Sequence, residues 1–289
     1  MKKTDYHIHP NYSIDAVPFS IQAYCTKAVK LKLEEICFTT HVEIDPVRRE
    51  LDNFVAVNGE RLSVWDFTWL DCYFTELAQA QERFKGAKLR IKAGLEVGYC
   101  PGQEKAIERI VNNYPFDFVL GAIHCLNHIS ISSKQESPLY FQDCTLNNLR
   151  RDYFSTLQAA VESDLFDCIA HLDLYRRYGL IHLGPEVMTI HREMIEPILS
   201  RMAKQGMGLE INTSSYRRGL KEFHPTKEIL RLAVQAGISV FTVGSDAHTL
   251  CELGDNIEAA LLLLKEYNLN NHIFTQRQAH VFPFSAANS

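Results

Sequence analysis

The sequence predicts an α/β protein built as one barrel of the (β/α) type with mainly parallel strands. Two observations support this fold class. Short strand-like runs alternate with longer runs of helical spacing, and strand followed by helix recurs seven times, which is the pattern of βα units and a parallel sheet. Nearly every strand-like run also ends in a polar side chain, at the position where parallel barrels carry their chemistry.

Seven runs have the length and composition of buried strands. The first begins at residue 4 and the last ends at residue 248, so the pattern extends over most of the chain. The predicted strands are residues 4–9, 34–42, 90–98, 116–124, 166–174, 208–214 and 239–248.

Helical spacing of apolar residues marks the stretches between the strands. In residues 225–237, for example, Ile229, Leu232, Ala233 and Ala236 recur on one face. A further apolar stretch, residues 259–267, is short and flanked by charge, and we interpret it as a buried helix. The other predicted helices are residues 20–33, 69–84, 103–114, 149–163 and 189–205.

We expect residues 1–289 to form a single domain. A chain of this length can form one large domain or two ordinary ones, but no Gly/Ser-rich or Pro-rich linker interrupts the alternation of strands and helices. The least regular stretch is residues 44–71, which we interpret as an insertion or lid within the barrel.

The composition excludes several classes of protein. With 46% hydrophobic and 22% charged residues, the chain has the balance of a soluble globular protein. Its formal net charge of −5 disfavours general binding of nucleic acid, which needs a basic surface. No apolar run reaches the ~18 residues of a membrane span. The eight cysteines form no Cys-x-x-Cys pair and no secretory signal is evident, so we expect a cytoplasmic protein.

Potential metal ligands end all seven predicted strands. The carboxyl ends of barrel strands open on one face, and residues two apart on a strand point to the same side, so these side chains converge on one cavity. In chain order they are His7 and His9, His41, Glu96, His124, His171 with Asp173, Glu210 with Asn212, and Asp246 with His248.

These residue types favour a metal cluster when they are taken together. A lone histidine near a strand end is more often a hydrogen-bonded structural residue than a ligand. Burying several imidazoles and carboxylates without partners is very costly, however, and divalent ions bind both neutral His and ionised Asp or Glu. Rival motifs are absent or weak: there is no Gly-x-Ser-x-Gly elbow, Walker loop or His-Glu-x-x-His helix. The sequence therefore indicates metal-assisted hydrolysis.

The motifs, from DYHIHPNYSID at residues 5–15 to VGSDAH at residues 243–248, resemble those of the polymerase and histidinol phosphatase (PHP) superfamily of metal-dependent phosphoesterases. Residues 94–126, 209–214 and 273–284 are similar to its histidinol-phosphate phosphatase branch. This resemblance implies a distorted (β/α)7 TIM-like barrel with a metal site at the C-terminal face of the strands. It also implies two or three divalent ions, usually zinc, manganese or iron.

Three metal sites follow from the resemblance. One ion would be held by His7, His9, Glu96 and Asp246; a second would share Glu96 as a bridge and add His124 and His171; a third would take Asp15, His41 and His248. Thr40 stands where the family often has Asp, which weakens the expected orientation of His41. Besides the bridging Glu96, the expected catalytic residues are Asp246 and His248, either of which, or a water, would handle the leaving-group proton.

Two arginine pairs are candidates for binding a phosphate group. Arg176 and Arg177 follow the fifth strand, and Arg217 and Arg218 follow the sixth. Arginine suits bidentate recognition of phosphate, although loop arginines are as often simply solvated. The resemblance favours phosphate binding, and we expect Arg176 and Arg217 to be the members that point inward.

The expected function is hydrolysis of a small-molecule phosphate ester, with L-histidinol phosphate, in histidine biosynthesis, as the first candidate. The alternatives are a related phosphatase or phosphodiesterase acting on nucleotides or sugar phosphates, and a non-catalytic PHP fold used for binding. The full set of ligands in this sequence argues against the non-catalytic alternative. The sequence does not predict the oligomeric state.

Overall fold

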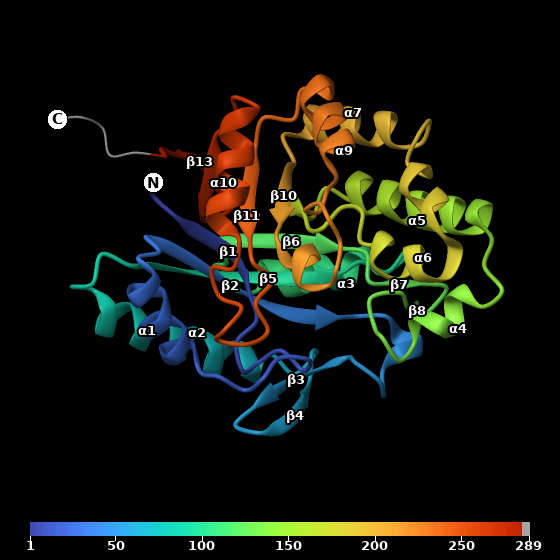
Figure 1. Ribbon diagram of the computed structural model, residues 1–289. Helices are drawn as coiled ribbons and strands as arrows, with labels where there is room; N and C mark the ends of the chain where they lie inside the picture. The colour runs from blue at the N-terminus through green and yellow to red at the C-terminus, as the bar shows by residue number, and fades with distance from the viewer. Residues whose placement is uncertain (285–289) are drawn as a thin grey trace.

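Seven parallel strands form the central sheet of the protein in the computed structural model, which describes residues 1–284 (Figure 1). The order is β1-β2-β5-β6-β9-β10-β11. Backbone hydrogen bonds from His9 N to Ala247 O (2.9 Å) and from Ala247 N to His7 O (3.2 Å) join the end of β11 to β1 and nearly close the sheet. The strands are β1 (Thr4–Ile8), β2 (Glu35–Glu43), β5 (Arg90–Gly98), β6 (Phe118–Ala122), β9 (Cys168–Ile169), β10 (Gly208–Asn212) and β11 (Phe241–Gly244). The predicted barrel is confirmed.

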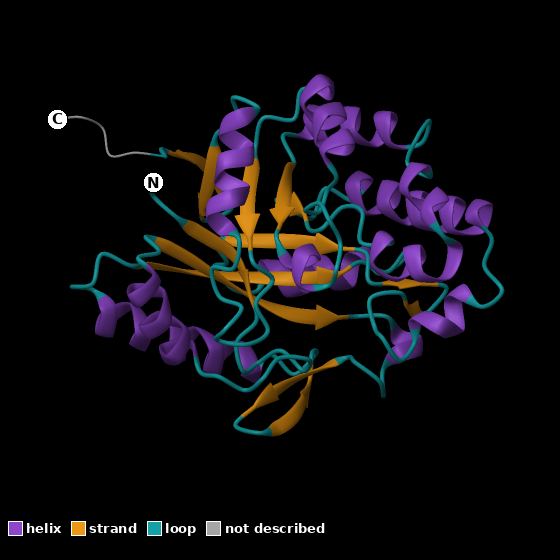
Figure 2. Ribbon diagram, viewed as in Figure 1, coloured by secondary structure: helices purple, strands orange, loops and turns teal. Residues whose placement is uncertain are grey.

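Helices surround the sheet on the outside (Figure 2). They are α1 (Ile21–Leu31), α2 (Thr68–Phe84), α3 (Glu104–Asn112), α4 (Ser137–Phe141), α5 (Leu146–Glu162), α6 (Arg176–Leu183), α7 (Ile195–Gln205), α8 (Ser214–Arg217), α9 (Lys227–Ala236) and α10 (Ile257–Glu266), with 3-10 turns η1 (Pro46–Arg48) and η2 (Pro185–Thr189). Ser20, Thr145 and Thr226 cap helix starts through their side-chain oxygens. The helix predicted over 189–205 begins only at Ile195, because Thr189 ends η2 and residues 190–194 form turns.

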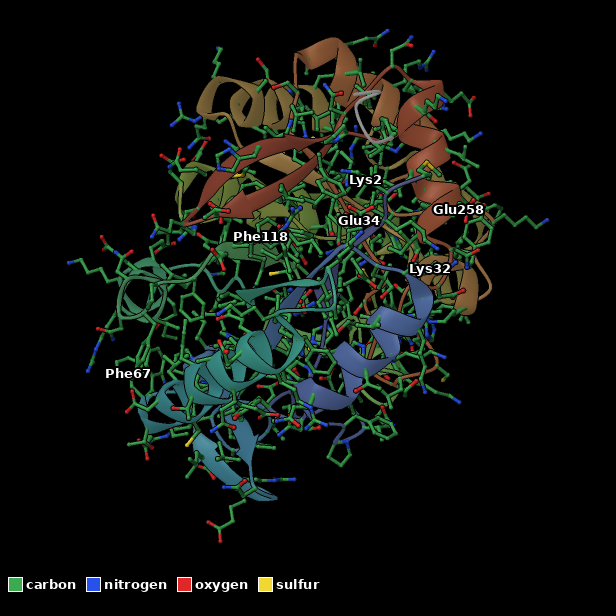
Figure 3. All side chains as sticks on the ribbon, turned by 90° about the vertical axis from the view of Figure 1, so that its left-hand side faces the viewer. Lys2, Lys32, Glu34, Phe67, Phe118 and Glu258 are labelled. Atoms are coloured by element: carbon green, nitrogen blue, oxygen red, sulfur yellow. The ribbon has the colours of Figure 1, made fainter. Side chains whose placement is uncertain are left out.

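The barrel interior is filled at the end where the strands begin. Tyr6, Phe118 and Phe274 pack there, with ring centroids 5.2 Å apart for Tyr6 and Phe118 and 4.7 Å for Phe118 and Phe274. Phe274 belongs to the hairpin of β12 (Asn271–Thr275) and β13 (Gln278–Phe282), and its N–H donates to Tyr6 Oη at 2.7 Å. Figure 3 views this side of the molecule, with Phe118, Lys2 and Glu34 labelled. The hairpin therefore seals one end of the barrel.

The irregular segment 44–71 contains η1 and a small hairpin, β3 (Phe54–Val57) and β4 (Glu60–Ser63), before α2 begins. A second hairpin, β7 (Cys125–Leu126) and β8 (Ile129–Ser130), follows β6. Arg48 joins the two regions, since it donates to His128 O (2.9 Å) and to Glu136 Oε1 (2.9 Å).

Among residues 1–284, none of the helices combines the length and the apolar character that crossing a membrane requires.

Candidate metal centre

The carboxyl ends of the strands bring the nine predicted metal ligands to one mouth of the barrel. His41 of β2 lies in register with Glu96 of β5. His124, His171 and Asp246 each follow two residues after the end of β6, β9 and β11. We call these nine residues the ligand cluster: His7, His9, Asp15, His41, Glu96, His124, His171, Asp246 and His248.

The first part of the ligand cluster surrounds one point between four buried side chains. His7 Nε2 lies 3.3 Å from Glu96 Oε1 and 3.8 Å from Asp246 Oδ1. His9 Nε2 lies 3.2 Å from Asp246 Oδ1 and 3.6 Å from Glu96 Oε2. Around a tetrahedral zinc with bonds of about 2.0–2.1 Å, ligand atoms lie roughly 3.3 Å apart. These pairs of atoms have spacings close to those of ligands on one such ion, and His7, His9 and Asp246 form one set of ligand atoms within 4.8 Å of one another.

A second group shares the same carboxylate. Glu96 Oε1 lies 2.8 Å from His171 Nε2 and 3.4 Å from His124 Nε2, and the two imidazole nitrogens are 3.4 Å apart. Because Glu96 Oε1 also faces His7, this carboxylate lies between the two groups, where a bridging ligand would have to be.

The third group is at the rim. Asp15 Oδ2 lies 3.3 Å from His41 Nδ1 and 3.1 Å from His248 Nε2, and the Asp15 side chain is 44% exposed. The His248 ring stacks on His9 with centroids 4.1 Å apart. The three predicted ligands of this group thus face one another at the open side of the cluster.

Glu43 is a cluster neighbour that the sequence analysis missed. Its Oε1 lies 2.7 Å from both His41 Nε2 and His124 Nδ1, so it links the rim to the second group. It contacts the His41 ring, for which Thr40 predicts a weaker orientation. The signal was present in the sequence: Glu43 follows His41 by two residues on one strand, so both side chains point to the same side.

The polar atoms of the ligand cluster are better placed to bind a metal ion than to form hydrogen bonds with one another. His7 Nε2 and His9 Nε2 are buried and have no hydrogen-bond partner within residues 1–284, and leaving such atoms unsatisfied is costly. Four sets of three ligand atoms, one each from His, Asp or Glu, lie within 4.8 Å of one another. They are His7–Glu96–His171, His7–His9–Asp246, His9–Asp15–His248 and His41–Glu96–His124.

The charges of the cluster support the same interpretation. Burial raises the pKa of Glu96, but the nearby His7 and His124 lower it well below its usual value. Burial lowers the pKa of His124, but Glu96 and Glu43 outweigh this effect and raise it to about 9. For His9, burial and the neighbouring His248 lower the pKa to about 4. With protein groups alone, protons on histidine balance the carboxylates, and divalent cations would supply the same positive charge.

The cluster opens into a cavity of about 510 Å³, a size typical of small-molecule sites. One wall comes from the segment 44–71 through Arg48, Leu51 and Asp52, and another from residues 130–136. The hairpin residues 54–63 are not among the lining residues. That residues 44–71 act as a lid therefore stays a prediction. Only the first part of the segment, which contains Arg48, Leu51 and Asp52, contacts the cavity.

The expected orientation of the arginines is wrong. Arg177 and Arg218 line the cavity, whereas Arg176 and Arg217 are held elsewhere. Arg176 and Arg177 are adjacent in α6, so their side chains leave the helix about 100° apart, whereas Arg218 lies just after the end of α8.

Arg176 is 2% exposed and pairs with Asp173 (Nε to Oδ2, 2.8 Å) while donating to Phe223 O. Arg217 reaches Glu252 and donates to Ser245 O and Asp246 O. Both therefore stabilise loops beside the cluster.

Asp173 and Glu210, two carboxylates near the ends of predicted strands, belong to none of the four ligand sets. Asp173 is bonded to Arg176, to His224 Nδ1 (2.5 Å) and to Thr226 N (2.9 Å). Glu210 accepts from His7 Nδ1 (2.7 Å), on the side of that ring away from Glu96. These groups surround the ligand cluster.

The fold and the ligand cluster define a βα-barrel protein with a candidate metal centre at the carboxyl ends of its strands. The chain belongs to the PHP domain family, which matches residues 5–214. The family resemblance inferred from the motifs is thereby confirmed.

Named relatives extend over nearly the whole chain. A protein of Deinococcus radiodurans named "Probable histidinol-phosphatase" is 30% identical over 256 residues, which is 88% of this chain and 90% of that protein. The histidinol-phosphatase of Lactococcus lactis is 28% identical over 92% of this chain and 91% of its own length.

A solved structure matches the fold closely. The crystal structure of histidinol phosphate phosphatase from Lactococcus lactis, complexed with zinc, L-histidinol and phosphate, has a TM-score of 0.76 at 25% identity. The match covers 96% of this chain and 99% of that one.

Proposed function

We propose that the protein is a metal-dependent phosphomonoester hydrolase and, specifically, a histidinol-phosphatase that releases phosphate from L-histidinol phosphate. The observation that carries this proposal is the composition of one cavity. Seven of the nine residues of the ligand cluster, all but His7 and His9, line it together with Arg177 and Arg218, two arginines without a carboxylate partner within residues 1–284. A phosphate ester presents the negative charge that both groups would bind.

The proposed ions number two or three and are zinc, manganese or iron. His7, His9, Glu96 and Asp246 would hold the first, and His124 and His171 would hold the second with Glu96. Asp15, His41 and His248 would hold the third. When bound, such ions supply Lewis-acid polarisation of phosphate oxygens and lower the pKa of water toward neutrality. The zinc in the Lactococcus lactis structure supports this assignment.

The proposed role of the arginines is to bind and orient the phosphoryl group. Burial and the adjacent Arg218 lower the pKa of Arg177, so the two positive charges repel each other. A phosphate dianion between them would relieve this repulsion and accept bidentate hydrogen bonds. Arg177 also lies over the Tyr178 ring, 5.1 Å from its centroid, which restrains the guanidinium.

Asp246 and His248 are the proposed candidates for transferring the leaving-group proton. Both line the cavity, which places them within reach of a bound ester. His248 Nδ1 lies 3.0 Å from the backbone oxygen of Asp246, which fixes the orientation of the His248 ring relative to Asp246. We propose that one of them, or a water that they orient, protonates the departing alcohol.

The remaining wall of the cavity would surround the leaving group. It combines apolar Leu51 and Leu174 with polar Asp52 and Glu136, which suits an organic group that carries both a ring and a positive charge. We propose that residues 44–53 cover this group in the bound state. A small-molecule ester is the proposed substrate, since the net charge of −5 does not favour nucleic acid, and the cytoplasm is the proposed location.

The decisive experiment is a comparison of substrates with the purified full chain loaded with zinc or manganese. We expect the kcat/KM for L-histidinol phosphate to exceed that for nucleotide and sugar phosphates by orders of magnitude. Faster turnover of a nucleotide or sugar phosphate would show that L-histidinol phosphate is not the preferred substrate. Absence of any phosphatase activity in a metal-loaded, folded protein would favour the non-catalytic alternative.

A further inference from the structure

Glu210 is a fully buried carboxylate that contacts two parts of the ligand cluster. Its Oε1 lies 2.7 Å from His7 Nδ1, and its Oε2 accepts the backbone N–H of His171 at 2.9 Å. Asn212 Nδ2 donates to Oε2 at 3.1 Å. His7 and His171 are proposed ligands of two different ions, so a single side chain touches both sites.

The contact with His7 fixes which nitrogen of the ring is available to a metal. An ionised carboxylate only accepts hydrogen bonds, so His7 Nδ1 must carry the proton. When the ring is neutral, as a metal-binding imidazole is, the lone pair is then on Nε2, the buried atom that has no partner within residues 1–284 and faces Glu96 and Asp246. Hydrogen bonding of the far nitrogen is the general means by which proteins orient a metal-binding imidazole.

The contact with His171 fixes a backbone that is otherwise unfavourable. His171 has φ of +25°, a conformation that L-residues adopt only when their surroundings compel it. The hydrogen bond from its N–H to Glu210 holds this conformation, and the conformation directs Nε2 toward Glu96 at 2.8 Å.

The surrounding structure is shaped to admit this carboxylate. Gly244 of β11 lies beside it, and a Cβ at that position would overlap both Glu210 Oε1 and His7 Cβ. The strand pairing places Glu210 beside Thr242 and Asn212 beside Gly244. Glycine at position 244 thus leaves the space in which Glu210 reaches His7.

We propose that Glu210 is a positioning residue that sets the tautomer of His7 and the backbone of His171, and thereby orients ligands of two neighbouring metal sites. The inference rests on the proposed metal centre. The proposed role requires two acceptor oxygens, because His7, His171 and Asn212 all donate hydrogen bonds to the Glu210 side chain. Glutamine has one acceptor, so an amide here either donates to His7 Nδ1 and moves the ring proton to Nε2, or opposes the N–H of His171.

The test is the affinity of the metal-stripped full chain for Zn²⁺, measured by competition with a chromogenic chelator. We expect Glu210→Gln to weaken Zn²⁺ binding by about 10–100-fold, the usual cost of losing such an outer partner. The visible spectrum of the Co²⁺-loaded variant should change as well, because the coordination of the ion by His7 changes. In a His7→Ala background, Glu210→Gln should cost clearly less, since the ring that it orients is gone.

The matched control is Glu35→Gln. Glu35 is equally buried, but it bonds Tyr6 and Arg90 near the start of the strands, so its loss should lower stability and leave Zn²⁺ affinity unchanged. Should Glu210→Gln fail to fold, Glu210→Asp keeps both acceptors on a shorter side chain and should show an intermediate loss. A Zn²⁺ affinity within twofold of the wild type in the folded variant would overturn the inference. A wild-type chain that binds no Zn²⁺ would instead overturn the metal centre itself.

Discussion

At the scale of single residues, Glu96 has the most connections within the ligand cluster. One of its oxygens faces His7, His124 and His171, and the other faces His9. Within residues 1–284, Asp246 approaches His7 and His9, and Glu210 meets only the far nitrogen of His7 and the backbone of His171. Neither carboxylate lies between the two groups as Glu96 does.

We therefore expect Glu96→Gln to reduce kcat/KM by more than the about 10–100-fold that loss of an outer partner costs. The amide keeps the size of the side chain but loses the negative charge that two ions would share. Kinetics and metal content by elemental analysis, measured on the same sample, check this prediction. Full activity with a full complement of metal would refute the bridging assignment.

The protonation of His124 gives the metal affinity a pH dependence. Its pKa is raised to about 9 because Glu96 and Glu43 outweigh burial, so the proton is bound below that pH and must leave when a metal binds. Zn²⁺ affinity should rise about tenfold per pH unit, for each proton displaced, up to pH 9. His9, with a pKa lowered to about 4 by burial and His248, adds no dependence above pH 5. Chelator competition at pH 6, 7 and 8 measures the slope, and a flat profile would contradict the prediction.

Substituting either of the two cavity arginines should lower kcat/KM, whereas substituting an exposed arginine outside the cavity should not. Arg177→Ala and Arg218→Ala each remove hydrogen bonds to a charged group, worth about 1.5–3 kcal/mol, so kcat/KM should fall about 10- to 100-fold and inhibition by inorganic phosphate should weaken. Arg201→Ala, on the exposed side of α7, is the control and should behave like the wild type. Equal effects of all three substitutions would show that Arg177 and Arg218 do not bind the phosphate group.

At the scale of elements, the sequence predicted what depends on periodicity and missed what depends on loop geometry. All seven barrel strands were predicted, because apolar runs of strand length and the polarity of the strand ends are local properties. The convergence of the strand-end ligands followed from strand order, since parallel strands place their ends together, whereas Asp15 and the division into three sites came from the family resemblance. The orientations of Arg176 and Arg177 could not be predicted, because they depend on Asp173 and on the loop at Phe223, far along the chain.

The hairpin β12–β13 should stabilise the barrel without affecting its chemistry. Phe274 is 3% exposed and fills the interior at the end away from the ligand cluster. Phe274→Ala should lower the free energy of unfolding by about 3–5 kcal/mol and leave Zn²⁺ affinity unchanged. Urea denaturation measures the loss. Val281→Ala, at a side chain that is 54% exposed on β13, is the control and should change stability by less than about 0.5 kcal/mol.

At the scale of the whole molecule, the ligand cluster joins the strand ends of β1, β2, β5, β6, β9 and β11, so bound ions would link most of the sheet. An ion present at 1,000 times its Kd stabilises the folded state by about 4 kcal/mol. Removal of metal with a chelator should therefore abolish phosphatase activity and lower the Tm, and added Zn²⁺ or Mn²⁺ should restore both. Calorimetry and activity assays on one sample test this. Unchanged activity after verified metal removal would contradict the metal mechanism.

The sealed end of the barrel has a consequence for the order of events in turnover. Because Tyr6, Phe118 and Phe274 fill the interior where the strands begin, the cavity has its opening on the side of the ligand cluster. Substrate and both products must pass through the same aperture. We expect phosphate, held by the arginines and the ions, to leave after the alcohol, so that its departure determines when the next ester can bind.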